Sequence, residues 1–206
     1  MKQQTKNPEN AGKFIVLYGI NNLGKTTQAK LLVEWLKKQK KKAKYLKYAV
    51  YDLEPSGTIL NDYLRNSNPD QLSPREFQLV QCLNKTQYQP ILEQELQDET
   101  WIIAEDYVGT SIAWGTGAGI DQNFLKQVNS HLRKPDFCFW FDGDRFMESQ
   151  ETNHKHETDD KLITKVRQIH QELAKKEGWT LINANESISD IHVKITEKIK
   201  MKLLNG

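Results

Sequence analysis

The segment Gly19–Thr26 is the part of the sequence whose residue types and spacing point most directly to chemistry. It reads GINNLGKT and satisfies the pattern G-x-x-x-x-G-K-[ST]. In such a loop, glycines allow backbone N–H groups to turn around phosphate oxygens, and a lysine ammonium reaches the terminal phosphates. Lys25 supplies that ammonium, and Thr26 supplies a hydroxyl suited to Mg²⁺. The pattern therefore predicts binding of ATP with Mg²⁺, and the residues expected to contact ATP are Gly19, Asn22, Leu23, Gly24, Lys25, Thr26 and Thr27.

The segments on either side of this loop favour the same interpretation. Phe14–Tyr18 is a short apolar run without alternation, which is typical of a strand buried on both faces of a parallel sheet. From Lys25 to about Gln39, apolar residues recur at helical spacing. A phosphate-binding loop needs this strand–loop–helix context, so a chance glycine turn is the weaker explanation.

Four further strands and two further helices are expected along the chain. The lysine-rich segment Lys37–Lys44 is expected to be a solvated helix end and turn rather than a nucleic-acid patch, and a second strand is expected over Tyr45–Tyr51. A short helix should follow Glu54–Thr58, and a longer one should start at Ser73–Pro74 and be kinked or divided by Pro90. The remaining strands are expected at Trp101–Ala104, Asp136–Phe141 and Trp179–Asn183.

Strands that alternate with helices predict a doubly wound parallel sheet. The expected fold is therefore α/β: the three-layer fold of P-loop NTPases, with a five-stranded parallel sheet and helices on both faces. A length of 206 residues suits a single domain. The polar stretch at about 143–160 has almost no apolar face, so a mobile lid is expected there.

Composition excludes several classes of protein. Twenty-nine basic and 27 acidic residues leave a formal charge of +2, which argues against a nucleic-acid-binding or membrane-surface protein. No apolar run is long enough to span a bilayer, and the start of the chain lacks the apolar core of a signal peptide. Cys82 and Cys138 lie in apolar stretches without metal-site spacing, so free thiols in the cytoplasm are expected.

Beyond the phosphate-binding loop, the sequence resembles a known family. Residues Phe14–Gln28, FIVLYGINNLGKTTQ, resemble the opening of the thymidylate kinases. Further segments resemble family motifs in the same order: Glu54–Thr58 resembles Arg-Glu-Pro-Gly-Gly-Thr, Lys85 and Gln87 fall where the family has arginine and glutamine, Glu105–Gly115 resembles Asp-Arg-Tyr followed by Ser-x-Ala-Tyr-Gln-Gly, and Pro135–Asp142 resembles a Pro-Asp strand that ends in aspartate.

The resemblance implies transfer of the terminal phosphoryl group of ATP to the 5′-phosphate of a deoxynucleoside monophosphate, with dTMP converted to dTDP. It also implies Mg²⁺, a homodimer and a lid that closes over ATP. The residues implied as catalytic are Lys25, Glu105 and Arg145, with Thr26 and Glu105 at the metal. Those implied at the acceptor are Asn21, Glu54, Phe77, Lys85, Asp106, Tyr107 and Trp114.

Several of these assignments have alternatives at the level of sequence. Glu105 and Asp106 could each form a surface ion pair, and Glu54 could cap a helix. Phe77, Tyr107 and Trp114 could be core residues instead of contacts to a base. In the lid, Lys155, His154 and His156 are possible substitutes for Arg145, and a metal site at the two histidines is not expected because no further ligands are nearby.

The chain departs from the family pattern at three positions. Asn21 replaces an acidic residue of the loop, Leu53 replaces the arginine of Arg-Glu-Pro, and Asp106 replaces the arginine of Asp-Arg-Tyr. Because the last change inverts a charge, Asp106 cannot hold the acceptor phosphate as that arginine would. Either Lys85 carries more of this role or the acceptor differs.

Two other functions therefore stay open. A deoxynucleoside kinase transfers phosphate to a hydroxyl and needs a base, a role for which Glu54 is the candidate. A nucleotide-binding protein with weakened catalysis would explain the altered Asn21, Leu53 and Asp106 positions.

Overall fold

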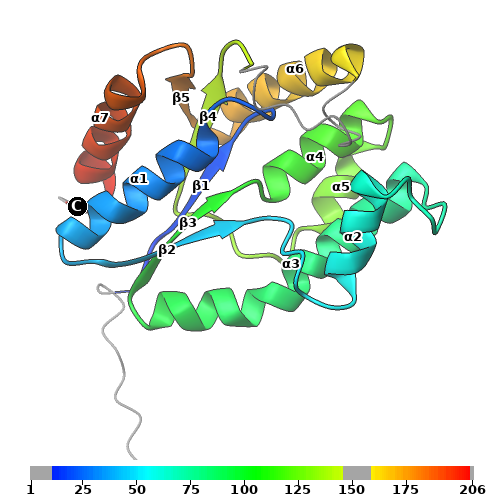
Figure 1. Ribbon diagram of the computed structural model, residues 1–206, viewed down its shortest axis with the longest axis horizontal. Coiled ribbons are helices and arrows are strands. Elements are labelled where there is room, and N and C mark those ends of the chain that lie inside the picture. The colour runs from blue at the N-terminus through cyan, green and yellow to red at the C-terminus, as the bar shows by residue number, and fades with distance from the viewer. Residues whose placement is uncertain (1–10, 146–158, 205–206) are drawn as a thin grey trace, which may run out of the picture.

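Five parallel strands form one sheet in the computed structural model, which describes residues 11–145 and 159–204 (Figure 1). The strand order is β2-β3-β1-β4-β5, so β1 lies at the centre, between β3 and β4. This confirms the expected α/β fold with a five-stranded parallel sheet. The strands are β1 (Phe14–Tyr18), β2 (Lys42–Lys47), β3 (Thr100–Glu105), β4 (Phe137–Asp142) and β5 (Thr180–Asn183).

Helices connect the strands and cover both faces of the sheet. They are α1 (Lys25–Lys38), α2 (Ser56–Arg65), α3 (Pro74–Gln97), α4 (Val108–Gly117), α5 (Gln122–Val128), α6 (Asp160–Glu177) and α7 (Ile188–Ile199), followed by the π-helical turn η3 (Lys200–Leu204).

The central strand β1 has two buried faces, and each belongs to a different apolar cluster. Leu17 packs in one cluster with Leu32 of α1, and α7 lies beside α1 on that side (Figure 1). Val16 packs in the other cluster with Leu92 of α3. Since successive strand residues point to opposite faces, a strand covered on both sides needs a continuous apolar run, and FIVLY is such a run.

The prediction of a second strand over Tyr45–Tyr51 was wrong in its bounds, because the strand starts and ends nearer the N-terminus. β2 begins at Lys42 and ends at Lys47, so part of the lysine cluster lies in a strand instead of a turn. β2 is at the edge of the sheet, where Lys42, Lys44 and Lys47 are exposed and the residues between them are more buried. Charged side chains on an edge strand discourage pairing with another chain, which accounts for lysine in this position.

Helix α3 begins as its sequence predicts. Ser73 and Glu76 form a capping box, in which the Ser73 hydroxyl accepts from the Glu76 N–H and the Glu76 carboxylate accepts from the Ser73 N–H. Pro90 lies inside the helix and does not divide it. The expected lid at 143–160 lies, except for its two ends, outside the described residues, as do His154, Lys155 and His156.

Candidate active site

The phosphate-binding loop lies between the carboxyl end of β1 and the start of α1. Gly19 has a φ of 136° and Gly24 a φ of 76°, which are backbone conformations that side chains disfavour. A Cβ atom on Gly19 would also lie 2.6 Å from the carbonyl oxygen of Phe141 in β4. Glycine is therefore required at Gly19 by both conformation and space.

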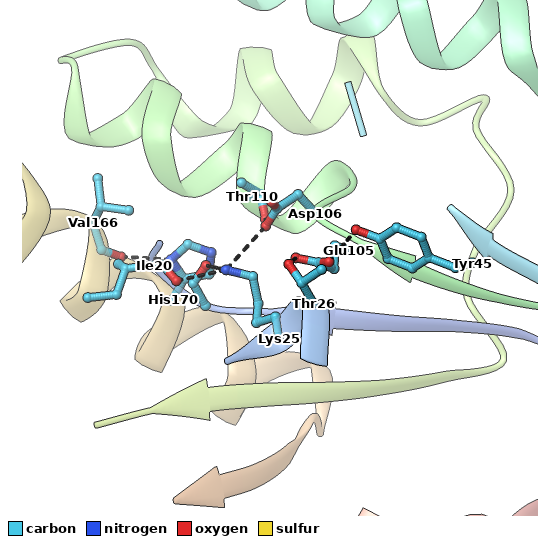
Figure 2. Close-up of polar contacts among 10 residues, drawn as sticks. Ile20, Lys25, Thr26, Tyr45, Glu105, Asp106, Thr110, Val166 and His170 are labelled. Carbon is cyan, nitrogen blue, oxygen red and sulfur yellow. Dashed lines mark hydrogen bonds and ion pairs between the residues drawn. The ribbon is translucent and has the colours of Figure 1, made fainter. Parts of the chain in front are cut away.

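Lys25 is the first residue of α1, and its side chain is 5% exposed. Its ammonium donates to the carbonyl oxygens of Gly19, at 3.0 Å, and Ile20, at 2.7 Å. Asp106 directly follows β3, and its carboxylate lies 3.8 Å from the same nitrogen (Figure 2). The ammonium is thus held at the mouth of the loop by three oxygen atoms that phosphate oxygens can replace.

A buried histidine lies behind this lysine. His170 of α6 is fully buried, and its Nδ1 is 3.0 Å from the carbonyl oxygen of Val166, which makes Nδ1 the donor (Figure 2). Burial, assisted by the charge of Lys25, lowers the pKa of His170 to about 4. The imidazole is therefore neutral at physiological pH and adds no second positive charge beside Lys25.

Thr26 and Glu105 bring two kinds of oxygen ligand together. The Thr26 hydroxyl donates to Oε2 of Glu105 at 3.0 Å, and the Tyr45 hydroxyl donates to Oε1 (Figure 2). Burial and the Glu105 carboxylate raise the pKa of Tyr45, so its phenol stays protonated and remains a donor. Mg²⁺ in nucleotide sites uses one or two protein oxygens with phosphates and water. The Thr26–Glu105 pair fits this requirement.

One cavity of about 550 Å³ contains most of the residues singled out from sequence. It extends from the phosphate-binding loop across the carboxyl end of β3 to α2, α3 and α4. The predicted site residues that line it are Asn21, Asn22, Leu23, Gly24, Lys25, Thr26, Thr27, Phe77, Lys85, Glu105, Asp106, Tyr107 and Trp114.

Three predicted site residues do not line this cavity. Gly19 lies beneath it and contributes the carbonyl oxygen that holds Lys25. Glu54 is exposed on the loop before α2, where its carboxylate accepts from the Thr58 hydroxyl. Arg145 lies at the edge of the described chain, 3.8 Å from the carboxylate of Asp160.

Lys85 is the most deeply buried cation of the cavity wall, at 1% exposure. Its amine donates to the Ser111 hydroxyl at 2.7 Å and to the carbonyl oxygen of Gln81 at 2.9 Å. Burial lowers the pKa of Lys85 to about 7, which the negative charge of Asp106 opposes without overcoming. An anion that entered the cavity would favour the charged amine, so Lys85 is suited to bind one.

The three candidate aromatic residues belong to the core as well as to the cavity wall. Phe77 stacks on Tyr63, with ring centroids 3.9 Å apart. Tyr107 is 1% exposed and lies 4.8 Å from the ring of Tyr48. Trp114 is 5% exposed and packs in the same apolar cluster as α1. All three are therefore core residues that also line the cavity, and their contact with a base stays a prediction.

Sequence reasoning missed Tyr45 and Arg65. The sequence indicates only that Tyr45 begins a strand. Its hydrogen bond to Glu105 depends on the register between β2 and β3, in which Tyr45 pairs with Ile103. Arg65 ends α2, lines the cavity and lies with its guanidinium 4.9 Å from the ring of Tyr51. The position of Arg65 in a helix that follows a strand-end loop could have indicated that this arginine faces the site.

Comparison with known proteins agrees with this geometry. The family model described as thymidylate kinase matches residues 17–195. The chain belongs to the thymidylate kinase family. Among curated members, a thymidylate kinase from Plasmodium falciparum is 28% identical over 197 residues, covering 93% of this chain and 92% of that protein. A probable thymidylate kinase from Pyrococcus horikoshii is 31% identical over 202 residues, covering 94% of this chain and 98% of that protein.

A solved structure supports the fold of this family. The structure of a thymidylate kinase from Candida albicans matches with a TM-score of 0.76 at 21% identity, covering 93% of this chain and 92% of that chain. Thymidylate kinases are nucleoside monophosphate kinases, so the expected class of enzyme is confirmed. Within residues 11–145 and 159–204, no helix combines the length and apolarity needed to cross a membrane.

Proposed function

We propose that this thymidylate kinase family member transfers the terminal phosphoryl group of ATP to the 5′-phosphate of dTMP, giving dTDP and ADP. The observation that carries the proposal is the continuous cavity with a phosphate-binding loop at one end and cations at the other. Lys25 lies at the first end, and Lys85 and Arg65 line the second. A kinase that joins two phosphate groups needs such an arrangement, because it must position two anions and reduce their repulsion.

Lys25 is the residue expected to act on the transferring phosphoryl group. When phosphate oxygens replace the carbonyls of Gly19 and Ile20, the ammonium can follow the negative charge that develops during transfer. Thr26 and Glu105 would hold Mg²⁺. When bound, this ion neutralises negative charge on the phosphates. Tyr45 keeps the Glu105 carboxylate oriented through its hydroxyl. Arg145, at the border of the expected lid, stays a predicted contact to ATP.

The acceptor end requires a different set of cations from the one that the family motif implies. Asp106 is directed at Lys25 and repels an acceptor phosphate. Lys85 and Arg65 offer the positive charge instead, with Phe77 as an apolar wall for the base. Asn21 also lines the cavity and stays a predicted contact to the acceptor. The acceptor is therefore held from the side of α2 and α3.

The direct test is ADP release from Mg²⁺-ATP with dTMP, dUMP, dCMP, dGMP, dAMP and thymidine. Signal with dTMP supports the proposal. Preference for thymidine would make the protein a nucleoside kinase, although Glu54, the candidate base for that function, is exposed and does not line the cavity. Release of ADP with none of these acceptors, despite binding of ATP, would indicate a nucleotide-binding protein.

Lys25→Ala is the matched loss-of-function variant for this assay. Removal of one charge-stabilising group costs about 10²- to 10³-fold in kcat, and we expect a loss of this size. Lys38→Ala is the control, because Lys38 is an exposed lysine at the end of the same helix and does not line the cavity. Thermal unfolding of both variants should stay close to that of the wild type.

A homodimer in the cytoplasm completes the proposal. Leu79, Leu83 and Ile91 of α3 are each more than 40% exposed and recur at helical spacing, so a second copy could cover them. Leu83→Glu should convert a dimer to a monomer in analytical ultracentrifugation, whereas Glu93→Gln on the same helix should not. The compartment rests on Cys82 and Cys138, which are both free thiols.

A further inference from the structure

A second cavity, of about 710 Å³, lies outside the proposed active site. It is bounded by the start of α4, the chain between α5 and β4, the end of α6, and η3. Tyr107 is the one residue that lines both cavities within the described chain. The position of this cavity beside β4, and the residues that line it, give it a chemistry of its own.

The cavity has an aromatic wall that is fixed in place. Trp179 stacks on Tyr18, with ring centroids 4.1 Å apart and planes 22° apart. Gly109 of α4 holds this pair: a Cβ atom there would lie 2.5 Å from Cη2 of Trp179 and 2.9 Å from Cε1 of Tyr18. Tyr18 is buried, whereas Trp179 is partly exposed. Trp179 therefore offers a rigid aromatic surface to a flat ring.

Positive charge dominates the rim. Two acidic residues, Asp136 and Glu177, line the cavity against four basic ones. Arg133 is engaged by Glu93, at 2.9 Å. The other three basic residues form no ion pair within the part of the chain that the structure describes, and they are Lys126, Lys134 and Lys202.

One lysine of this rim lies in an unfavourable electrostatic environment. Burial lowers the pKa of Lys126, and the positive charge of Lys176, which does not line the cavity, lowers it further, whereas the Glu177 carboxylate opposes this change. Lys126 donates to the amide oxygen of Gln122 at 2.8 Å, which does not remove the repulsion between the two ammonium groups. An anion bound in the cavity beside Lys126 would favour the charged form of this amine.

The wall also contains polar atoms that lack a partner. The amide nitrogen of Asn129 donates to the carbonyl oxygen of Leu125 at 2.8 Å, which leaves Oδ1 of Asn129 as a buried acceptor. Within the described residues, neither this oxygen nor the hydroxyl of Tyr107 has a hydrogen-bond partner. Unpaired buried polar atoms are costly, and a ligand that carries donors could satisfy them after a small side-chain rotation.

We propose that this second cavity binds a nucleoside phosphate, with its base against Trp179 and its phosphates beside Lys126 and Lys134. The aromatic wall selects a flat ring, the lysines that line the cavity select an anion, and Asn129 selects a ring with N–H donors. A cavity of this volume is in the range that accommodates small-molecule ligands. The occupant would touch Gly109 in α4, the helix that follows Asp106 in the chain.

The test is the number of nucleotides bound per chain, measured by isothermal titration calorimetry with ATP and with dTTP. We expect two sites in the wild type, one of which is lost in Lys126→Glu and in Lys134→Glu. Lys175→Glu is the matched control, because Lys175 is an exposed lysine of α6 that does not line the cavity. Lys25→Ala should weaken the other site, so failure of the active-site proposal can be recognised separately.

Two further arms identify the ligand chemistry. Tripolyphosphate and adenosine each carry only one half of the proposed ligand, and each should bind the second site at least about tenfold more weakly than ATP. One nucleotide per chain in both the wild type and Lys126→Glu would overturn the proposal. It would also be overturned if Lys126→Glu split a dimer in analytical ultracentrifugation without loss of a nucleotide, since the cavity would then be an interface with a second copy.

Discussion

The ammonium nitrogen of Lys25 lies 3.8 Å from a carboxylate oxygen of Asp106, across the mouth of the first cavity. The Thr110 hydroxyl donates to the same oxygen at 3.2 Å and steadies the carboxylate. Asp106 has a φ of 53°, a conformation that aspartate tolerates better than most residues. A carboxylate at this point competes with phosphate oxygens for Lys25 and repels the acceptor.

Substitution of Asp106 should therefore improve phosphate binding. Asp106→Asn is expected to lower KM for ATP by about threefold to tenfold, since Lys25 loses a competing anion. Asp106→Arg is expected to raise kcat/KM for dTMP by about tenfold, since a guanidinium can bind a phosphate through two hydrogen bonds. Steady-state kinetics with each substrate varied in turn would measure both effects. A large fall in kcat/KM for Asp106→Asn would show instead that the carboxylate serves the acceptor.

The charge of Lys85 should set the pH dependence of acceptor binding. With its pKa lowered by burial to about 7, the amine loses its proton as pH rises through neutrality, so KM for dTMP should rise between about pH 6 and 8.5. Lys85→Arg keeps its charge and should flatten this rise. The titration of dTMP itself is common to both proteins, so their difference isolates Lys85. Identical profiles would remove Lys85 from the acceptor site.

The same group should affect stability with a defined sign. The pKa of Lys85 is lower in the folded chain than its ordinary value of 10.5, so the unfolded chain binds more protons between those two values. The free energy of unfolding should therefore rise with pH from about 7 to 10, relative to that of Lys85→Met. Urea unfolding at several pH values would measure the difference, and a constant difference would contradict the expectation.

Glu105 should control the requirement for Mg²⁺. Glu105→Gln keeps the shape of the side chain but removes its charge, so the Mg²⁺ concentration for half-maximal rate should rise by about tenfold or more. Tyr45→Phe removes only the hydrogen bond to Glu105 and should lower kcat by a smaller factor. A titration of the rate with MgCl₂ at fixed ATP would rank the two variants. If Glu105→Gln responded to Mg²⁺ as the wild type does, the carboxylate would not hold the metal.

Asn84 should be a main support of the loop between β2 and α2. Its buried amide donates to the carbonyl oxygen of Val50 and to the Ser56 hydroxyl, both at 2.8 Å, and accepts from the Val50 N–H at 2.9 Å. Asn84→Leu leaves these partners unpaired and is expected to cost about 2–4 kcal/mol of unfolding free energy. Gln94→Ala, at an exposed position of the same helix, should stay within about 0.5 kcal/mol. Chemical denaturation would compare them.

Local pattern was enough to predict the elements that carry the donor site. The FIVLY run, the glycines and Lys25 lie next to one another in sequence, and so do the strand, loop and helix that they form. The start of α3 was equally local, because the capping box of Ser73 and Glu76 spans only four residues. Where an element depends on neighbours in sequence, its position was predicted correctly.

Contacts between segments that are distant in the chain could not be predicted from the sequence. The hydrogen bond from Tyr45 to Glu105 depends on strand register. The lysines of β2 are compatible with a strand because β2 lies at the edge of the sheet, a position that the sequence does not reveal. The direction of Asp106 toward Lys25, and the position of Glu54 outside the cavity lining, follow from how loops turn at strand ends. The acceptor site was for this reason less predictable than the phosphate-binding loop.

The close approach of Gly19 to the carbonyl oxygen of Phe141 joins the phosphate-binding loop to a strand that is synthesised much later. During translation, the loop segment leaves the ribosome before β4 exists, so the nascent chain lacks the surface on which the loop rests. Affinity for ATP should accordingly appear only after β4 has emerged and paired with β1. Retention of a nascent chain on an ATP resin would thus report when the centre of the sheet is complete.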